Sequence, residues 1–353
     1  MTTTGPRLVA WEVTRACQLA CLHCRAEAQP AAHPDELSHE EGLRLLDQIA
    51  DNGRPIVILT GGDPLLRADV YELAAYGTGK GLHMVASPCG TSLTPQVVGR
   101  LLRAGISRVS ISVDGATAKT HDAFRGTPGA FQATMAGLAY CHEGGLPFQI
   151  NTTITKRNVH DLPALLQLAL SSGAVGWHPF MLVPTGRGKA IEGEEVSPEQ
   201  YEEALRWLEG VAAQYPLQVK PTCAPHFVRI ARQLNGGRLP IHHRPEGNRL
   251  HAVSRGCMAG NGFCFVSHTG EVFGCGFLPL RAGDVRELPF AQIYEEAPLF
   301  RALREPSLLH GKCGLCEYRI ACGGCRARAL AATGDYLGAE PFCTYEPRPK
   351  VAP

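Results

Sequence analysis

The sequence has almost no net charge and no long apolar run. Its 34 Lys and Arg nearly balance 33 Asp and Glu, so the formal net charge is +1 over 353 residues. This balance gives no electrostatic reason to expect nucleic acid or an anionic membrane surface as a partner. No run of about 18 apolar residues predicts a membrane span, and the first residues, MTTTGPRLVAWEV, lack the apolar stretch of a secretory signal. We therefore expect a cytoplasmic protein.

Cysteine, by contrast, is abundant. The chain has 14 cysteines, and eight of them lie after residue 256. In a secreted protein an even cysteine count would predict disulfides, but in a reducing compartment closely spaced cysteines predict metal ligation or catalysis.

The first part of the chain alternates apolar runs with segments of helical length. The expected strands are residues 8–13, 55–60, 82–87, 108–113, 147–154 and 176–183. One of the helices between them should begin at a capping box formed by Ser38 and Glu41. Mostly continuous apolar strands that alternate with helices predict a parallel sheet covered by helices. Six such units fit either a partial barrel or an open doubly wound sheet, and the pattern does not separate the two.

The pattern changes after about residue 220, where glycine and cysteine become frequent and helical periodicity fades. We expect this region to fold around bound metal, because it has too few apolar residues for a conventional core. The chain is therefore divided into a barrel of residues 1–215, a bridging region of residues 216–256 and a cysteine-rich domain of residues 257–353.

Three cysteines follow the first expected strand. Cys17, Cys21 and Cys24 are separated by three and then two residues, and they lie where α/β barrels and sheets place their chemistry. A structural zinc site uses four protein ligands, whereas a [4Fe–4S] cube held by three thiolates leaves one iron open to a small molecule. The alternative is a zinc loop with a remote fourth ligand such as His23.

The Cys-x3-Cys-x2-Cys motif after a first strand resembles the radical S-adenosylmethionine (AdoMet) superfamily, whose fold is a partial (β/α)6 barrel. The resemblance implies that AdoMet binds the open iron through its amino and carboxylate groups. It also implies that electron transfer, from a reductant such as flavodoxin or ferredoxin, splits AdoMet to a 5′-deoxyadenosyl radical that abstracts a substrate hydrogen. The protein would then position the reactants and exclude water.

Further motifs at later strand ends carry the same resemblance. The segment after the second strand resembles the family's Gly-Gly-Glu-Pro turn, whose backbone meets the AdoMet amino group; its residues are Gly61, Gly62, Asp63 and Pro64. Asp63 replaces the usual Glu. Two glycines allow a close approach that a Cβ would prevent.

Five other residues match family positions around AdoMet. Ser112 and Asp114 end the fourth strand and are expected to face AdoMet. Arg125 is expected to pair with the AdoMet carboxylate, which a guanidinium fork suits. Asn151 and Leu182, on the fifth and sixth strands, are expected to contact the ribose and adenine.

The C-terminal cysteines resemble the SPASM extension of radical AdoMet enzymes. The resemblance implies two auxiliary [4Fe–4S] clusters, one held by Cys257, Cys264, Cys275 and Cys325, and the other by Cys313, Cys316, Cys322 and Cys343. Two structural zinc sites are the alternative, because two Cys-x2-Cys pairs also have zinc-ribbon spacing. Cys89 and Cys141 lie outside both sets and are expected to be buried structural thiols.

Segments 180–188, 222–226, 262–272 and 322–337 resemble the branch that contains the heme d1 and alternative heme biosynthesis enzymes. This resemblance implies a heme-type tetrapyrrole as the substrate. The reaction would be either oxidative decarboxylation of its propionate side chains or removal of a side chain. The alternatives are a maturase of a ribosomally synthesised peptide and a non-catalytic iron–sulfur protein for electron transfer or scaffolding. Two features speak against a peptide: the cluster loop starts at residue 17, which leaves no room for a peptide-recognition domain, and Gly276 stands where sulfatase-maturing enzymes often have an Asp.

Two residues of the bridging region are candidates for a catalytic role. Cys223 and His226, in TCAPH, lie between the expected barrel and the cysteine-rich domain, where a substrate would be held. The alternative is a loop thiol and a structural histidine. Arg187 and Lys189, after the sixth strand, are candidates to neutralise substrate carboxylates.

Overall fold

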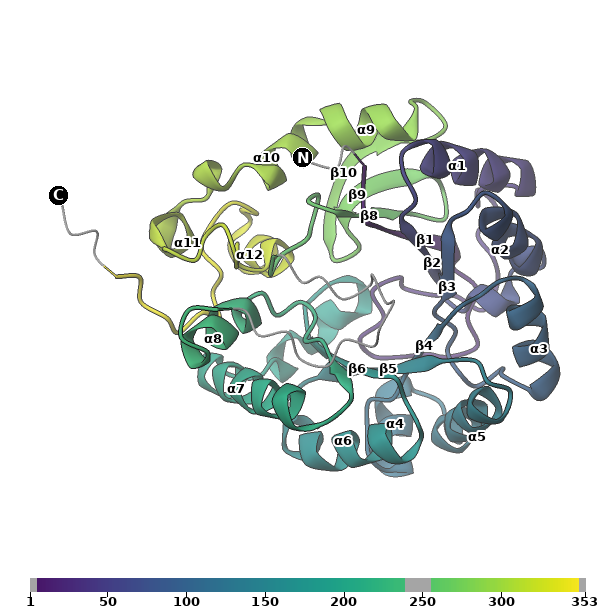
Figure 1. Cartoon of the computed structure of the whole chain (residues 1–353), viewed down its shortest axis with the longest axis horizontal. Helices are drawn as coiled ribbons and strands as arrows, with labels where there is room; N and C mark the ends of the chain where they lie inside the picture. Colours follow the sequence, from purple (N-terminus) through teal and green to yellow (C-terminus); the bar gives the residue numbers. More distant parts are fainter. Residues whose placement is uncertain (1–4, 239–254, 349–353) are drawn as a thin grey trace.

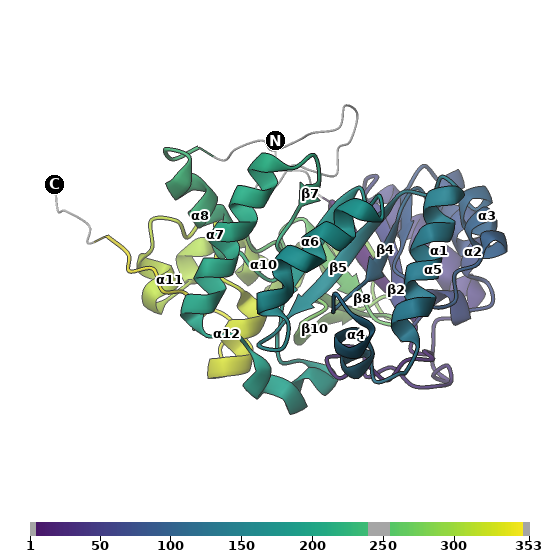
Figure 2. The ribbon, with the colours of Figure 1, turned by 90° about the horizontal axis from the view of Figure 1, so that it is seen from below.

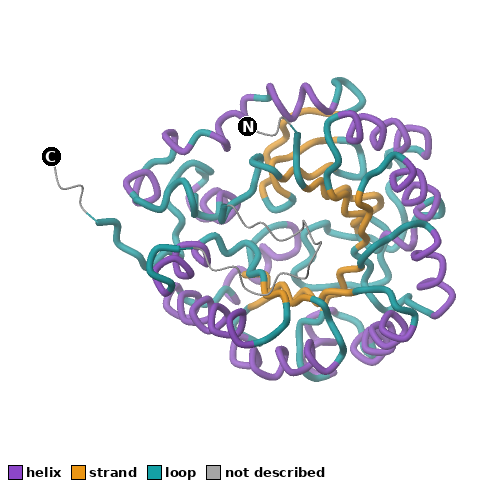
Figure 3. Tube along the Cα trace, in the orientation of Figure 1, coloured by secondary structure: helices purple, strands orange, loops and turns teal. Residues whose placement is uncertain are grey.

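The computed structural model describes residues 5–238 and 255–348. Its centre is one ten-stranded sheet with the order β10-β9-β8-β1-β2-β3-β4-β5-β6-β7. Figure 3 shows the strands on the inner side of an arc and the helices outside it. Within the described ranges the two ends of this order do not pair, so the sheet there is an incomplete barrel.

The first seven strands run parallel and in chain order. They are β1 (Leu8–Thr14), β2 (Ile56–Gly61), β3 (His83–Ala86), β4 (Val109–Ser112), β5 (Phe148–Ile154), β6 (Gly176–Met181) and β7 (Gln218–Val219). The six expected strands are therefore all present. A short seventh strand, which the sequence analysis did not identify, extends the edge.

Helices cover the convex side of the arc (Figure 1). They are α1 (His39–Asp51), α2 (Val70–Gly79), α3 (Pro95–Arg103), α4 (Ala118–Arg125), α5 (Ala130–Glu143), α6 (Leu162–Ser171) and α7 (Pro198–Gln214). The expected capping box begins α1: the Glu41 backbone N–H donates to the Ser38 hydroxyl and the Ser38 N–H donates to the Glu41 carboxylate. No helix in the described ranges is long and apolar enough to cross a membrane.

The concave side of the barrel is polar. On β4, β5 and β6 the side chains that face the helices are buried and apolar, such as Ile111, Ile150 and Trp177. Their alternating neighbours point the other way, because successive side chains of a strand lie on opposite faces. These neighbours are partly exposed, and the polar ones are Ser110, Ser112, Gln149, Asn151, Thr153 and His178. The barrel therefore has a polar lumen, which suits a polar ligand.

The C-terminal part continues the same sheet. β8 (Phe263–Val266) pairs in parallel with β1, and β9 (Glu271–Cys275) and β10 (Leu278–Asp284) follow in antiparallel order. α9 (Phe290–Glu296) and α10 (Pro298–Arg304) cover these strands, and Val266, Val272, Phe290, Ile293 and Phe300 belong to the main apolar core. The expectation that the chain lacks a conventional core after residue 220 is therefore wrong for this stretch.

Short loops and helices complete the fold. α8 (His226–Leu234) lies in the bridging region, and α11 (Gly311–Leu315) and α12 (Arg326–Thr333) lie among the last cysteines. Figures 1 and 2 both place α7 and α8 on the same side of the molecule as α11 and α12. α8, in the described part of the bridging region, thus lies on the same side as the cysteine-rich end of the chain.

Candidate functional site

The first three cysteines gather directly after β1. Cys17, Cys21 and Cys24 pack in one small apolar cluster, and all three are free thiols. The backbone N–H groups of Leu19 and Ala28 each donate to a sulfur, of Cys17 and Cys24 respectively, at 3.4 Å. Such donors stabilise the thiolate form that binds metal. The donor set therefore fits an iron–sulfur cluster with three protein ligands.

Arg187 fixes this loop through three hydrogen bonds. Its Nε donates to the Cys21 carbonyl at 2.9 Å, its Nη1 to the Ala28 carbonyl at 2.8 Å, and its backbone N–H to the Cys24 carbonyl at 3.0 Å. Gly186 makes the approach possible: its φ is 58°, and a Cβ there would lie 2.4 Å from the Arg25 carbonyl oxygen. Arg187 therefore binds the cluster loop, whereas its place after the sixth strand predicted a contact with substrate carboxylates.

Asp114 and Arg125 form a buried ion pair beside the loop. Arg125 Nη2 lies 2.5 Å from Asp114 Oδ2, and Arg125 Nη1 donates to the Cys21 sulfur at 3.6 Å. Burial alone would raise the pKa of Asp114, but Arg125, with His23 and His121, lowers it below its usual value. The pair therefore stays charged, and the guanidinium of Arg125 lies beside the sulfur of Cys21. Both residues were expected to face AdoMet; that role stays a prediction.

The turn after β2 packs against the cluster loop. The Asp63 N–H donates to the Ala16 carbonyl at 2.7 Å, and a Cβ at Gly62 would lie 2.2 Å from the same oxygen. The Asp63 side chain is fully buried and accepts from Gln18 at 3.1 Å and from the Ser92 hydroxyl at 3.0 Å. The glycine is therefore needed for close approach, and the carboxylate fastens the turn to the loop.

The remaining expected AdoMet contacts lie around the same edge of the barrel. Gly61 ends β2 and Pro64 opens the next short helical turn. Ser112 and Asn151 are paired across β4 and β5, and Leu182 follows β6. Their contact with AdoMet stays a prediction.

Cys89 is a neighbour of the site that the sequence analysis missed. Its sulfur lies 3.4 Å from that of Cys17 and donates to the Gly62 carbonyl at 3.7 Å. Cys141, by contrast, is fully buried in the core as expected. The signal for Cys89 was its place after the third strand, because the carboxyl ends of parallel strands meet at one edge.

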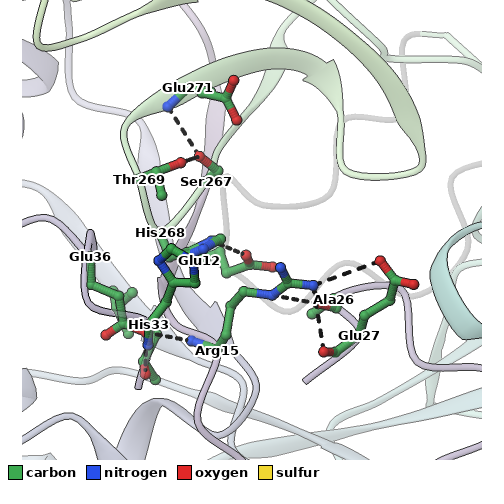
Figure 4. A network of polar contacts seen from close by, with 12 residues as sticks. Glu12, Arg15, Ala26, Glu27, His33, Glu36, Ser267, His268, Thr269 and Glu271 are labelled. Atoms are coloured by element: carbon green, nitrogen blue, oxygen red, sulfur yellow. Dashed lines mark hydrogen bonds and ion pairs between the residues drawn. The ribbon is translucent and has the colours of Figure 1, made fainter. Parts of the chain in front are cut away.

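A buried carboxylate joins the cluster loop to the hairpin of β8 and β9, and Figure 4 shows its contact with His268. Glu12 Oε1 lies 2.8 Å from His268 Nδ1, and Glu12 Oε2 accepts from Arg25 at 2.6 Å. Burial alone would raise the pKa of Glu12, but Arg25 and His268 lower it. Arg25 also lies over the ring of Phe265, 4.4 Å from its centroid. The loop and the hairpin are thus fixed to each other by charge.

Four of the C-terminal cysteines line one pocket. They are the set Cys313, Cys316, Cys322 and Cys343, and His226 and Arg229 line the same pocket. Arg229 is buried and pairs with Glu202 at 2.5 Å, so a cation lies among the thiols. Within residues 5–238 and 255–348, no three His, Cys, Asp or Glu side chains are close enough to hold a single metal ion as they stand. The donor chemistry fits an iron–sulfur cluster.

The other expected set is only partly brought together. Cys325 is buried in a second apolar cluster, and Cys257, Cys275 and Cys223 pack against it. Cys264 does not join them, because it is a fully buried member of the main core. The structure therefore assembles three of the four expected thiols and adds Cys223.

His226 occupies an interior position. Its side chain is 1% exposed, its Nε2 lies 3.9 Å from Glu340, and its ring lies 4.9 Å from that of Tyr201. Burial, more than the neighbouring charges, lowers its pKa to about 4, so the ring is neutral at pH 7. A catalytic role for His226 and Cys223 stays a prediction.

Comparison with known proteins adds to this geometry. Residues 11–169 match the model of the radical SAM superfamily, and residues 257–325 match SPASM, an iron–sulfur cluster-binding domain. An AdoMet-dependent heme synthase from Methanosarcina barkeri is 49% identical over 99% of this chain and 99% of its own length. The chain belongs to the radical SAM superfamily and to the family of the AdoMet-dependent heme synthases. It is therefore a radical AdoMet enzyme, and the branch expected from the sequence is confirmed.

One further sequence relative and one solved structure resemble this radical AdoMet enzyme. An Fe-coproporphyrin III synthase from the same organism is 33% identical over 95% of this chain and 87% of its own. Among solved structures, Streptococcus suis SuiB bound to its precursor peptide SuiA has a TM-score of 0.75 at 18% identity, covering 97% of this chain and 76% of its own. That likeness shows the fold, so the expected barrel with a SPASM extension is confirmed. Membership of these families implies AdoMet and iron–sulfur clusters as cofactors.

Proposed function

We propose that this enzyme is a heme synthase that converts propionate side chains of an iron porphyrin into vinyl groups. The observation that carries the proposal is the 49% identity to an AdoMet-dependent heme synthase over 99% of both chains. We further propose two auxiliary [4Fe–4S] clusters, a flavodoxin or ferredoxin as electron donor, and the cytoplasm as the location. A maturase role has weaker support, from mycofactocin maturase MftC of Mycobacterium ulcerans at 31% identity and from likeness of fold to SuiB at 18% identity, and is not proposed.

A side chain –CH2–CH2–COO⁻ becomes –CH=CH2 by losing one hydrogen atom, CO2 and one electron. When bound, AdoMet and the clusters supply the radical that takes the hydrogen atom and an acceptor for the electron. The hydrogen leaves on 5′-deoxyadenosine, so one nucleoside should form for each vinyl group.

The protein's own contribution is placement. Arg187 and Gly186 fix the cluster loop, and the charged pair of Asp114 and Arg125 lies beside the Cys21 sulfur. Holding reactants in position is worth several orders of magnitude in rate. The polar residues of the lumen offer hydrogen bonds: the Gln149 amide donates to Asn151 at 3.0 Å and contacts His178 at 2.9 Å. A polar ligand can exchange such contacts for its own.

The experiment uses anaerobically reconstituted protein with dithionite, AdoMet and iron-coproporphyrin III. We expect 5′-deoxyadenosine together with a porphyrin that has lost the elements of formic acid from a side chain, detected by liquid chromatography and mass spectrometry. Cys17→Ala is the control and should form neither. Nucleoside release with an unchanged porphyrin would refute the substrate. No nucleoside from fully iron-loaded protein would favour a scaffold or electron-transfer role.

A further inference from the structure

The sheet register separates two cysteines that were expected to share a cluster. Phe265 of β8 is paired directly with Phe273 of β9, so their side chains lie on the same face of the sheet. Cys264 precedes Phe265 by one residue and Cys275 follows Phe273 by two. Because successive side chains alternate between faces, Cys264 and Cys275 point to opposite faces.

The surroundings of the two thiols agree with the register. Cys264 is fully buried in the main core, and the charged group beside it is Arg304. Cys275 packs against the second apolar cluster, which contains Leu278 and Cys325. A one-residue slip of β8 would be needed to turn Cys264 toward Cys275, and it would turn Phe265 away from Phe273.

Cys223 stands where the fourth thiol is missing. It packs, as Cys257 and Cys275 do, against the second apolar cluster, to which Cys325 belongs. Four thiols that would repel one another when ionised form a poor structural core. They are a suitable ligand set for an iron–sulfur cluster, whose iron ions carry positive charge.

The backbone at Cys223 is strained. Its φ is 54°, one of two positive values among the non-glycine residues of the described ranges. Such a conformation is unfavourable for a residue with a side chain and persists only where the surroundings impose it. Here the Tyr201 hydroxyl and Arg328 Nη1 both donate to the Cys223 carbonyl, at 3.0 and 3.2 Å. The preceding Thr222 accepts from the Met181 N–H at 3.1 Å, which fastens the segment to β6.

We infer that Cys223 is the fourth ligand of the first auxiliary cluster, with Cys257, Cys275 and Cys325, in the place that the sequence analysis gave to Cys264. The cluster is then held by one thiolate from the barrel side and three from the C-terminal part. A sulfur bound to iron is no longer a free thiol that can exchange a proton or a hydrogen atom with the substrate, so this role replaces the catalytic role considered for Cys223. The inference does not depend on the identity of the substrate.

The test counts auxiliary iron alone. In a background where Cys17, Cys21 and Cys24 are all changed to Ala, the remaining iron belongs to the C-terminal sets. Into it we introduce Cys223→Ala or, as the matched control, Cys264→Ala. We expect Cys223→Ala to lose about four irons per chain, or to keep them with an altered electron paramagnetic resonance (EPR) spectrum after reduction. Cys264→Ala should keep both the iron and the spectrum of the background.

Three results would overturn the inference: an unchanged iron content and spectrum in Cys223→Ala, a loss of iron in folded Cys264→Ala, or equal changes in both. If Cys223→Ala does not fold, as judged by circular dichroism, Cys223→Ser carries the test. Serine oxygen is a harder ligand than sulfur, so this variant should keep its iron but shift the EPR spectrum. An unshifted spectrum would refute ligation. Since neither AdoMet nor porphyrin is present, failure here is distinct from failure of the proposed function.

Discussion

Gly186→Ala should damage the cluster loop through a contact that can be measured in advance. A Cβ at this position would lie 2.4 Å from the Arg25 carbonyl oxygen and 2.6 Å from that of Cys24, whereas ordinary contact starts at 3.4 Å. Relief requires the loop to move by 3.4 − 2.4 Å, about 1 Å. A misplacement of about 1 Å can cost about a hundredfold in rate.

Gly145→Ala is the matched control. Both glycines have positive φ, 58° at Gly186 and 70° at Gly145, but a Cβ at Gly145 would meet nothing within 4 Å. Each substitution should therefore lose about 1–2 kcal/mol of stability from the left-handed backbone. Only Gly186→Ala should also lose catalysis.

The assay measures 5′-deoxyadenosine release, iron content and the melting temperature for both variants under anaerobic conditions. We expect similar small decreases in melting temperature. The rate of AdoMet cleavage should fall by about two orders of magnitude in Gly186→Ala and stay within a factor of two of wild type in Gly145→Ala. Equal cleavage rates in the two variants would refute the view that Gly186 allows Arg187 and the loop to approach.

Cys17→Ala should abolish AdoMet cleavage and leave the C-terminal iron bound; loss of all iron would contradict independent sites. Cys316→Ala, in the four-cysteine pocket, should lower the melting temperature and the iron content together, because metal binding there contributes to folding; an unchanged melting temperature would argue against this coupling. Cys89→Ala should keep the iron but shift the EPR spectrum of the N-terminal cluster, since the Cys89 sulfur lies 3.4 Å from that of Cys17; an identical spectrum would count against contact in the loaded protein. Burial raises the pKa of Glu195 to about 7, against an opposing effect of Arg328; because the folded pKa is raised, stability should fall as pH rises from about 5 to 8, and melting curves of Glu195→Gln should lack that part of the decrease.

The parts of the site that depend on strand order could be predicted from the sequence. Cys17 and Gly62 each follow a strand and Ser112 is the last residue of one. Because the carboxyl ends of parallel strands meet at one edge, their gathering needs no knowledge of side-chain packing. Spacing along the chain was also enough to predict that the set with Cys313 and Cys316 comes together. All four of its thiols line one pocket.

What escaped prediction depends on register and on contacts between distant segments. Which face Cys264 occupies is decided by the pairing of β8 with β9, and a shift of one residue would reverse it. Arg187 reaches the Cys21 carbonyl across 166 positions of sequence, and no local pattern marks such a contact. The core after residue 256 was missed because its strands are too short to show a clear alternation, with β8 spanning four residues.

The pairing of β8 with β1 has a consequence for how the chain matures. Leu8 is aligned with Phe263, which is synthesised 263 − 8 = 255 residues later. Until then β1 can pair on one side only, with β2, and its other edge is open to other chains. Contacts of such long sequence separation form slowly. The nascent barrel is thus exposed to aggregation while the ribosome completes the protein, and the strand that carries the cluster loop gains its second neighbour only near the end of synthesis.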